Sequence, residues 1–197
     1  RLNQRAGRIV RAALEHAGDS IPTAAGNRAA TDATYRFLDN SNVLPSDIDD
    51  AHTHATVDLA AGYPGVLLVA QDTTDADFTS PARNGRLGQL AHPEHFGFFV
   101  HSALAMTADA LPLGLLHQHV WMRSAHERGE RKDRRHNDTA DKESQRRLDA
   151  EAACLAALPD DRTVVTIADR ECDFYDYFAV GRRPGRLRRV LHPRHLG

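Results

Sequence analysis

The spacing of apolar residues changes near residue 62, and this change constrains the fold more than any other feature. Before it, apolar side chains recur at helical spacing in three stretches: residues 2–17, 23–38 and 45–61. After it, short β-branched runs bounded by turn residues appear, beginning with residues 65–71. We therefore expect a helical region over residues 1–61 and an α/β domain over residues 62–180.

The second part of the chain has a recognisable order of elements. Residues 95–106 and 111–122 indicate an antiparallel hairpin, because the turn Ala108-Asp109-Ala110 separates them. Residues 141–158 have helical spacing, and residues 162–168 form another buried strand. The order strand, strand, strand, helix, strand matches the opening of a ribonuclease-H-like mixed sheet. Residues 181–197 are rich in arginine and lack periodicity, so we expect a basic, disordered tail.

Composition excludes several classes of protein. Lys and Arg number 25 against 27 Asp and Glu, so any nucleic-acid binding must rest on local basic clusters. No apolar run approaches the ~18 residues of a membrane span. The chain begins at Arg1 without Met or a secretory segment, so we expect a cytoplasmic protein clipped from something longer. Cys154 and Cys172 fit ordinary thiols in a reducing compartment.

Two aspartates stand out by position. Asp72 and Asp169 are each the first carboxylate after a buried strand. If the two strands are neighbours, both carboxylates emerge at one edge of the sheet, where open α/β sheets bind ligands. Oxygen ligands suit Mg²⁺, which keeps waters and substrate phosphate oxygens as further ligands. The alternative is that each aspartate simply favours a turn at a strand end.

Short sequence motifs around these aspartates resemble those of one enzyme family. They occur in the order Gln71-Asp72-Thr73-Thr74, Val100-His101-Ser102, Gly114-Leu115-Leu116-His117-Gln118, Trp121-Met122-Arg123, Asp141-Lys142-Glu143-Ser144 and Ala168-Asp169-Arg170-Glu171. Together they resemble the DDE cut-and-paste transposases of bacterial insertion sequences, in the group typified by the transposon Tn-five (IS-four) enzyme. Residues 34–38 and 40–43 are similar to that group's N-terminal helical DNA-binding region.

The resemblance implies a reaction and its partners. Asp72 and Asp169 would be the first two acids of the catalytic triad and would bind Mg²⁺ or Mn²⁺. The enzyme would act in DNA transposition by cleaving phosphodiester bonds at transposon ends and transferring the strand to target DNA. Full-length members act as dimers. The family's third acid is a Glu within a spaced signature, Tyr-…-Arg-…-Glu-…-Lys, which does not occur after Asp169. We therefore expect a truncated catalytic domain that binds DNA weakly and does not cleave it.

Candidate DNA contacts lie in two places. Arg36 is expected on the exposed face of a helix, and Tyr35 fits inward packing as well as DNA contact. The second place is a basic stretch that includes Arg123, Arg131 and Lys132. Near a phosphodiester site this stretch would track a DNA backbone, although interleaved acids also fit a solvated loop.

Other residues leave alternatives open. Glu143 and Glu171 would complete the site of a self-sufficient metal-dependent nuclease, whereas a catalytically inactive remnant would only bind DNA. Glu143 also fits a surface charge. Histidines 92, 95, 117 and 119 are possible zinc ligands, but no further ligand is evident. Trp121 fits core packing better than base stacking.

Overall fold

The structure is a computed structural model that describes residues 1–80, 86–90, 92, 94–123, 143–169, 172, 177–178 and 185–191. It contains two compact units, residues 1–48 and residues 49–197. Within the described ranges no helix combines the length and apolar character needed to cross a membrane.

The first unit is helical, as predicted, but its second predicted helix is divided. It consists of α1 (Leu2–Glu15), α2 (Ile21–Ala25) and α3 (Arg28–Leu38). Gly26 ends α2 in the left-handed region with φ 73°, a conformation that glycine adopts without a Cβ penalty. Asn27 then starts α3, and its Oδ1 accepts the Ala30 N–H at 2.9 Å. The Gly-Asn pair therefore breaks the single helix expected over residues 23–38.

Helix α4 (Pro45–Gly62) was expected to close the helical region, yet it packs on the sheet of the second unit. Its small residues Thr56 and Ala60 are buried, and Ala60 belongs to the core of that sheet. The imidazole of His52 accepts the backbone N–H of Leu115 through Nε2 at 2.9 Å. The division between the units thus falls at residue 48 instead of residue 61, because the buried Ala60 and the His52–Leu115 hydrogen bond attach α4 to the sheet.

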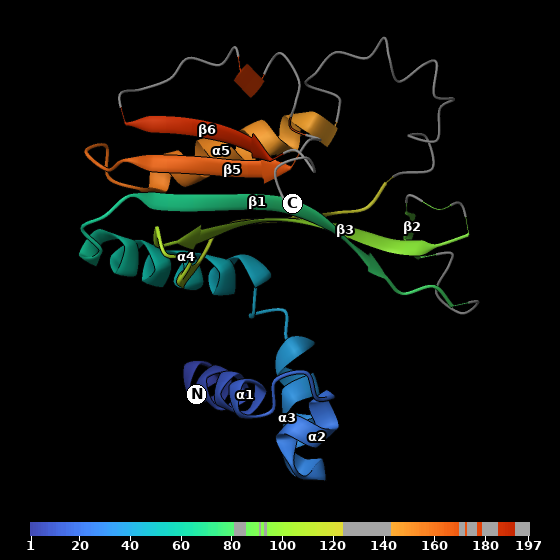
Figure 1. The fold of residues 1–197 in the computed structure, drawn as a ribbon. Coiled ribbons are helices and arrows are strands. Elements are labelled where there is room, and N and C mark those ends of the chain that lie inside the picture. The colour runs from blue at the N-terminus through green and yellow to red at the C-terminus, as the bar shows by residue number, and fades with distance from the viewer. Residues whose placement is uncertain are drawn as a thin grey trace. The chain divides into compact units, whose positions relative to one another are not determined.

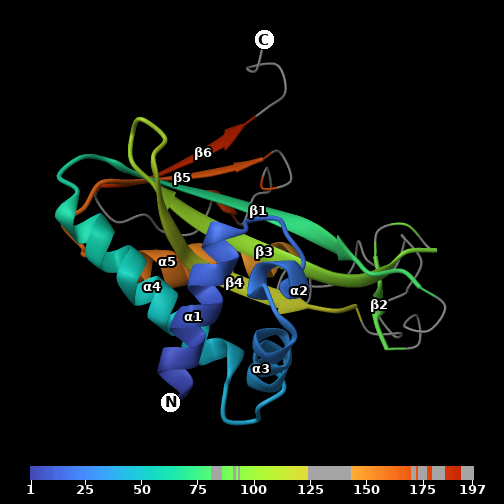
Figure 2. The ribbon, with the colours of Figure 1, turned by 90° about the horizontal axis from the view of Figure 1, so that it is seen from below.

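The second unit is built on a mixed six-stranded sheet, which confirms the α/β class. Its strands are β1 (Leu67–Asp77), β2 (Gly88–Gln89), β3 (Phe96–Met106), β4 (Pro112–Trp121), β5 (Val164–Asp169) and β6 (Arg186–Leu191). Figure 1 shows β6, β5, β1 and β3 side by side in that order, and Figure 2 shows β4 beside β3. Strands β1, β3 and β4 are antiparallel neighbours, whereas β5 and β6 run parallel to β1.

One face of the sheet carries the core. Buried positions alternate along β1, β3 and β5, as expected for strands with one covered face. Leu67, Val69 and Val164 pack there with Cys154 and Leu158, at the C-terminal end of α5 (Glu143–Ala157). Both cysteines are free and buried, and burial raises the pKa of the Cys154 thiol to about 12. Helix α5 therefore covers the sheet as it connects β4 to β5.

The basic segment after residue 181 was expected to be disordered, and for residues 186–191 this was wrong. These residues form β6, which pairs with β5 from Val164–Arg186 to Asp169–Leu191. Arg186 is buried and its Nη2 donates to the carbonyl of Pro159 at 2.8 Å. Arg188 forms an ion pair with Glu151 of α5. Partners distant in the sequence therefore allow an arginine-rich strand to join the sheet.

Candidate functional site

Asp72 and Asp169 occupy equivalent positions on two neighbouring strands. Parallel pairing of β1 with β5 ends with Gln71 opposite Ala168, the residues immediately before the two aspartates. Both strands alternate in the same phase, so Asp72 and Asp169 share the face opposite to that of Gln71 and Ala168. Their shared edge of the sheet follows from this register. The separation of their carboxylates stays a prediction of about 4–7 Å, as bridged cations permit.

Only one of the two aspartates ends a strand. Asp169 is the last residue of β5, but β1 continues past Asp72 to Asp77 because β3 pairs with it along its whole length. The turn explanation therefore does not apply to Asp72. Its position is the point where β1 loses β5 as a neighbour and keeps β3.

The surroundings of the two carboxylates differ. Asp72 is exposed, and its Oδ1 accepts the backbone N–H of Thr73 at 2.8 Å. The Asp169 side chain is 47% exposed, and its Oδ1 lies 3.4 Å from Nη1 of the buried Arg147 on α5. Both carboxylates are accessible to solvent and supply hard oxygen donors, which fits Mg²⁺ or Mn²⁺. Among the described residues, no three His, Cys, Asp or Glu side chains gather into a metal-binding group.

A buried chain of hydrogen bonds lies directly beside Asp72. Thr73 Oγ1 is 2.8 Å from His101 Nδ1, and His101 Nε2 is 3.1 Å from Gln71 Oε1. The Gln71 Nε2 amide donates to the hydroxyl of Tyr177 at 3.0 Å. Because the Gln71 carbonyl oxygen can only accept, Nε2 of His101 carries the proton and Nδ1 accepts from Thr73. We call Thr73, His101, Gln71 and Tyr177 the buried hydrogen-bond chain.

The buried hydrogen-bond chain favours the neutral form of His101. His101 is fully buried, and burial lowers its pKa to about 4, with further lowering by the positive charges of Arg147, His117 and His119. Burial likewise raises the pKa of Tyr177. This cluster was not predicted from the sequence, where Gln71 and His101 entered only as parts of short motifs. The alternation of the two strands, with both residues on the buried face, is the signal that identifies them.

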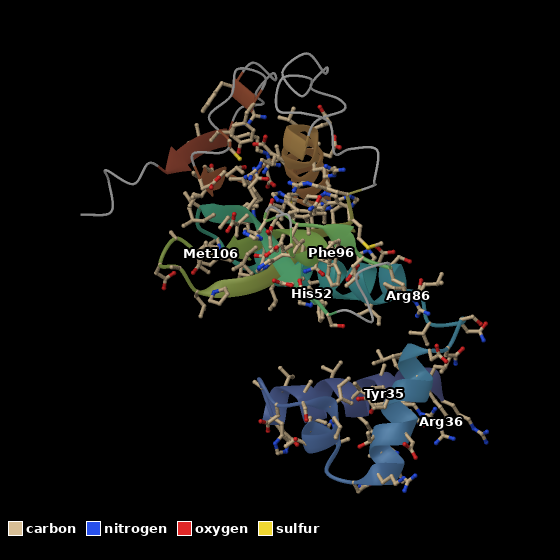
Figure 3. The ribbon with its side chains drawn as sticks, turned by 90° about the vertical axis from the view of Figure 1, so that its right-hand side faces the viewer. Tyr35, Arg36, His52, Arg86, Phe96 and Met106 are labelled. Carbon is tan, nitrogen blue, oxygen red and sulfur yellow. The ribbon has the colours of Figure 1, made fainter. Side chains whose placement is uncertain are left out.

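The two predicted DNA contacts of the helical unit are both on its surface. Tyr35 and Arg36 of α3 are exposed, and Figure 3 labels both side chains. The exposure of Arg36 confirms its predicted place, and Tyr35 is half exposed, so it does not pack fully inward. Arg36 Nε donates to the carbonyl of Asp32 at 3.2 Å, which leaves its terminal nitrogens outward for further bonds.

A basic groove on the helical unit escaped the sequence analysis. It encloses about 420 Å³ between α1 and α3, and Arg1, Arg5 and Arg8 line it above a floor that includes Ala30 and Ala33. Spacings of four and three residues place these arginines on one face of α1. Each is exposed, and none of them forms an ion pair within the described part of the chain. Three such cations beside a small-residue floor fit a phosphate backbone.

The basic stretch after β4 is described only at its start. Arg123 is half-buried, with its guanidinium carbon 4.3 Å from the ring centre of Phe99. Trp121 stacks on Phe99 at 5.3 Å and on His119 at 5.5 Å, and the guanidinium carbon of Arg146 lies 4.5 Å from its ring centre, so Trp121 packs within the protein. The remaining predicted residues lie outside the described residues or have undescribed side chains: Arg131, Lys132, Glu143 and Glu171.

His117 and His119 share one face with His101, through the pairs Ala103–His117 and His101–His119. They do not form part of a three-ligand group among the described side chains. Burial lowers the pKa of His117, and the neighbouring His119 lowers it further.

The helical unit matches a known family. Residues 1–43 match the family described as Transposase DNA-binding. The match covers α1, α2 and α3, and therefore the groove with its three arginines. It supports a transposase and DNA as a partner.

Proposed function

We propose that this chain belongs to a DDE transposase of the insertion-sequence group resembling the transposon Tn-five enzyme. The helical unit binds the transposon end, and the sheet unit carries two of the three acids for cleavage and strand transfer. The observation that carries the proposal is the register of β1 and β5, which aligns Asp72 with Asp169 downstream of a transposase DNA-binding region.

The sheet order supports a ribonuclease-H-like catalytic domain. Three antiparallel strands, β1, β3 and β4, are followed by a helix and then by β5, which lies parallel to β1 at its other side. This order makes the first and fourth long strands neighbours, which supports a shared site for their aspartates. Asp72 and Asp169 then serve as metal ligands, and their exposure leaves room for water and phosphate oxygens.

The metal would supply the charge needed for phosphoryl transfer. When bound, Mg²⁺ or Mn²⁺ neutralises phosphate charge and activates water and the 3′-hydroxyl for displacement at phosphorus. Strands β1 and β5 carry the carboxylates of Asp72 and Asp169. Arg147 donates to Asp169 Oδ1 at 3.4 Å, and the Thr73 backbone N–H donates to Asp72 Oδ1 at 2.8 Å.

A DNA-binding role without cleavage is the second candidate. It is favoured by the lack of a third metal-binding side chain beside the two aspartates among the described residues. A self-sufficient nuclease would instead recruit Glu143 or Glu171.

One assay separates these functions. The purified chain is incubated with a labelled duplex from the flank of its gene, with Mg²⁺ or Mn²⁺, at low and moderate salt. We expect salt-sensitive binding without nicking by this chain alone, because two carboxylates hold the second cation poorly. Nicking lost in Asp72→Ala and in Glu143→Gln would establish the nuclease. Absence of any DNA binding would contradict a transposase role.

A further inference from the structure

The carboxylate of Asp72 is connected to the protein interior through its neighbour in the chain. Thr73 makes two bonds: its backbone N–H donates to Asp72 Oδ1 at 2.8 Å, and its hydroxyl donates to His101 Nδ1 at 2.8 Å. Asp72 itself is exposed, whereas His101 is fully buried. Thr73 therefore joins a solvent-facing carboxylate to a buried ring.

The buried ring is fixed at its other nitrogen as well. His101 Nε2 donates to Gln71 Oε1, and Gln71 donates to the hydroxyl of Tyr177, which is also fully buried. Gln71 and Thr73 flank Asp72 on β1, and His101 lies opposite Thr73 on β3. The segment of β1 that presents Asp72 is thus bonded on both sides, at the place where pairing with β5 ends.

We propose that His101 and Thr73 are positioning residues for Asp72, which orient its carboxylate toward the cation shared with Asp169. The inference rests on the proposed function, because it requires Asp72 to be a metal ligand. Hydrogen-bonding partners behind a metal ligand commonly change metal affinity by 10–100-fold when they are removed. Neither residue contacts the cation in this proposal.

The imidazole offers two substitutions that separate positioning from packing. His101→Asn places an amide near the former Nδ1 and retains the bond to Thr73. His101→Gln places its amide near the former Nε2, retains the hydrogen bond to Gln71 and loses the hydrogen bond to Thr73. A purely structural role predicts that both substitutions act alike, whereas positioning through Thr73 predicts that only His101→Asn preserves metal binding.

Thr73 offers a milder test that leaves the core histidine in place. Thr73→Val removes the hydroxyl at nearly constant shape, and Thr73→Ser restores it. Thr74→Val is the matched control, since Thr74 is the exposed neighbour on the same strand.

The experiment measures Mn²⁺ affinity of the full 197-residue chain by the loss of the free-ion electron paramagnetic resonance signal. Circular dichroism and thermal melting are recorded for every variant. We expect Thr73→Val and His101→Gln to weaken Mn²⁺ binding about 10-fold. Thr73→Ser, His101→Asn and Thr74→Val should stay within about threefold of the wild type.

Two failures are distinguishable. Wild-type affinity in Thr73→Val, with binding still lost in Asp72→Asn, would overturn the positioning role and leave the metal site intact. If the wild-type chain binds no Mn²⁺, or if Asp72→Asn and Asp169→Asn bind it normally, the shared metal site and the positioning role both fall.

Discussion

Arg188 on β6 and Glu151 on α5 form a buried, two-point ion pair. Arg188 Nε lies 2.7 Å from each carboxylate oxygen of Glu151, and Nη2 lies 2.6 Å from Oε2. The two side chains are only 6% and 4% exposed. The guanidinium also lies over the ring of Tyr177, at 4.9 Å from its centre. This pair attaches the last strand to the crossover helix beneath the candidate site.

Breaking this pair at one end should strongly destabilise the protein. Arg188→Met leaves the Glu151 carboxylate buried without its cation, which typically costs about 3–5 kcal/mol. The double variant Arg188→Met, Glu151→Leu removes both charges and should recover most of that loss. Urea denaturation measures the free energies of unfolding, with the exposed Arg11→Met as control. A double variant as unstable as Arg188→Met would contradict the assignment.

Stability should depend on pH through His101. Its pKa is lowered from 6.5 to about 4 in the folded protein, chiefly by burial, so the unfolded chain binds the proton more readily. The free energy of unfolding should therefore fall as the pH drops from about 6.5 to about 4, by up to about 3 kcal/mol. His101→Gln should flatten this part of the profile, and His54→Gln on the exposed side of α4 should not. An unchanged slope in His101→Gln would refute the explanation.

Two glycines mark close approaches within the sheet unit. A Cβ on Gly97 would lie 1.9 Å from the carbonyl oxygen of Ala76, and one on Gly114 would lie 2.2 Å from Thr56 Oγ1. Gly114 also has φ 144°, in the region that other residues avoid. Gly97→Ala and Gly114→Ala should each cost roughly 2 kcal/mol or more in thermal unfolding. A Cβ on Gly7 of α1 would meet open space, so Gly7→Ala should stabilise the protein by about 0.5–1 kcal/mol. A destabilised Gly7→Ala variant would contradict the attribution of the other two losses to close contacts.

The arginine groove predicts a specific salt dependence of DNA binding. Arg5→Gln and Arg8→Gln should each weaken binding and reduce the slope of log affinity against log salt by about one, as expected for a lost phosphate contact. Arg11→Gln is the control, because Arg11 is equally exposed but does not line the groove. Fluorescence anisotropy with a labelled duplex measures the slopes. Equal effects of all three substitutions would mean that the groove is not the contact surface.

Periodicity predicted most elements because local residues determine them. The switch near residue 62, the hairpin before and after Ala108-Asp109-Ala110 and the crossover helix were all found within a few residues. The register of β1 against β5 could not be predicted, since pairing depends on contacts about a hundred positions apart. The sequence therefore identified the two aspartates as candidates. Their positions on neighbouring strands follow only from the pairing of β1 with β5.

Two of the errors have a common physical origin in distant partners. Strand β6 was interpreted as a tail because Arg186 and Arg188 look like surface charges, whereas in the folded chain Arg186 donates to the carbonyl of Pro159 and Arg188 pairs with Glu151. Helix α4 was assigned to the wrong unit because its apolar face is modest and its partner Leu115 lies far along the sequence. The Gly26-Asn27 break was a local signal, and it was available in the sequence.

The most direct test of the account is anomalous diffraction from crystals of the chain soaked in Mn²⁺. We predict one anomalous peak within about 2.0–2.3 Å of a carboxylate oxygen of Asp72 and of Asp169, with the two carboxylates about 4–7 Å apart. Asp72→Asn crystals should lose that peak while the sheet is unchanged. Carboxylates that diverge to separate surroundings, or a peak bound to neither aspartate, would contradict the shared metal site and with it the proposed transposase chemistry.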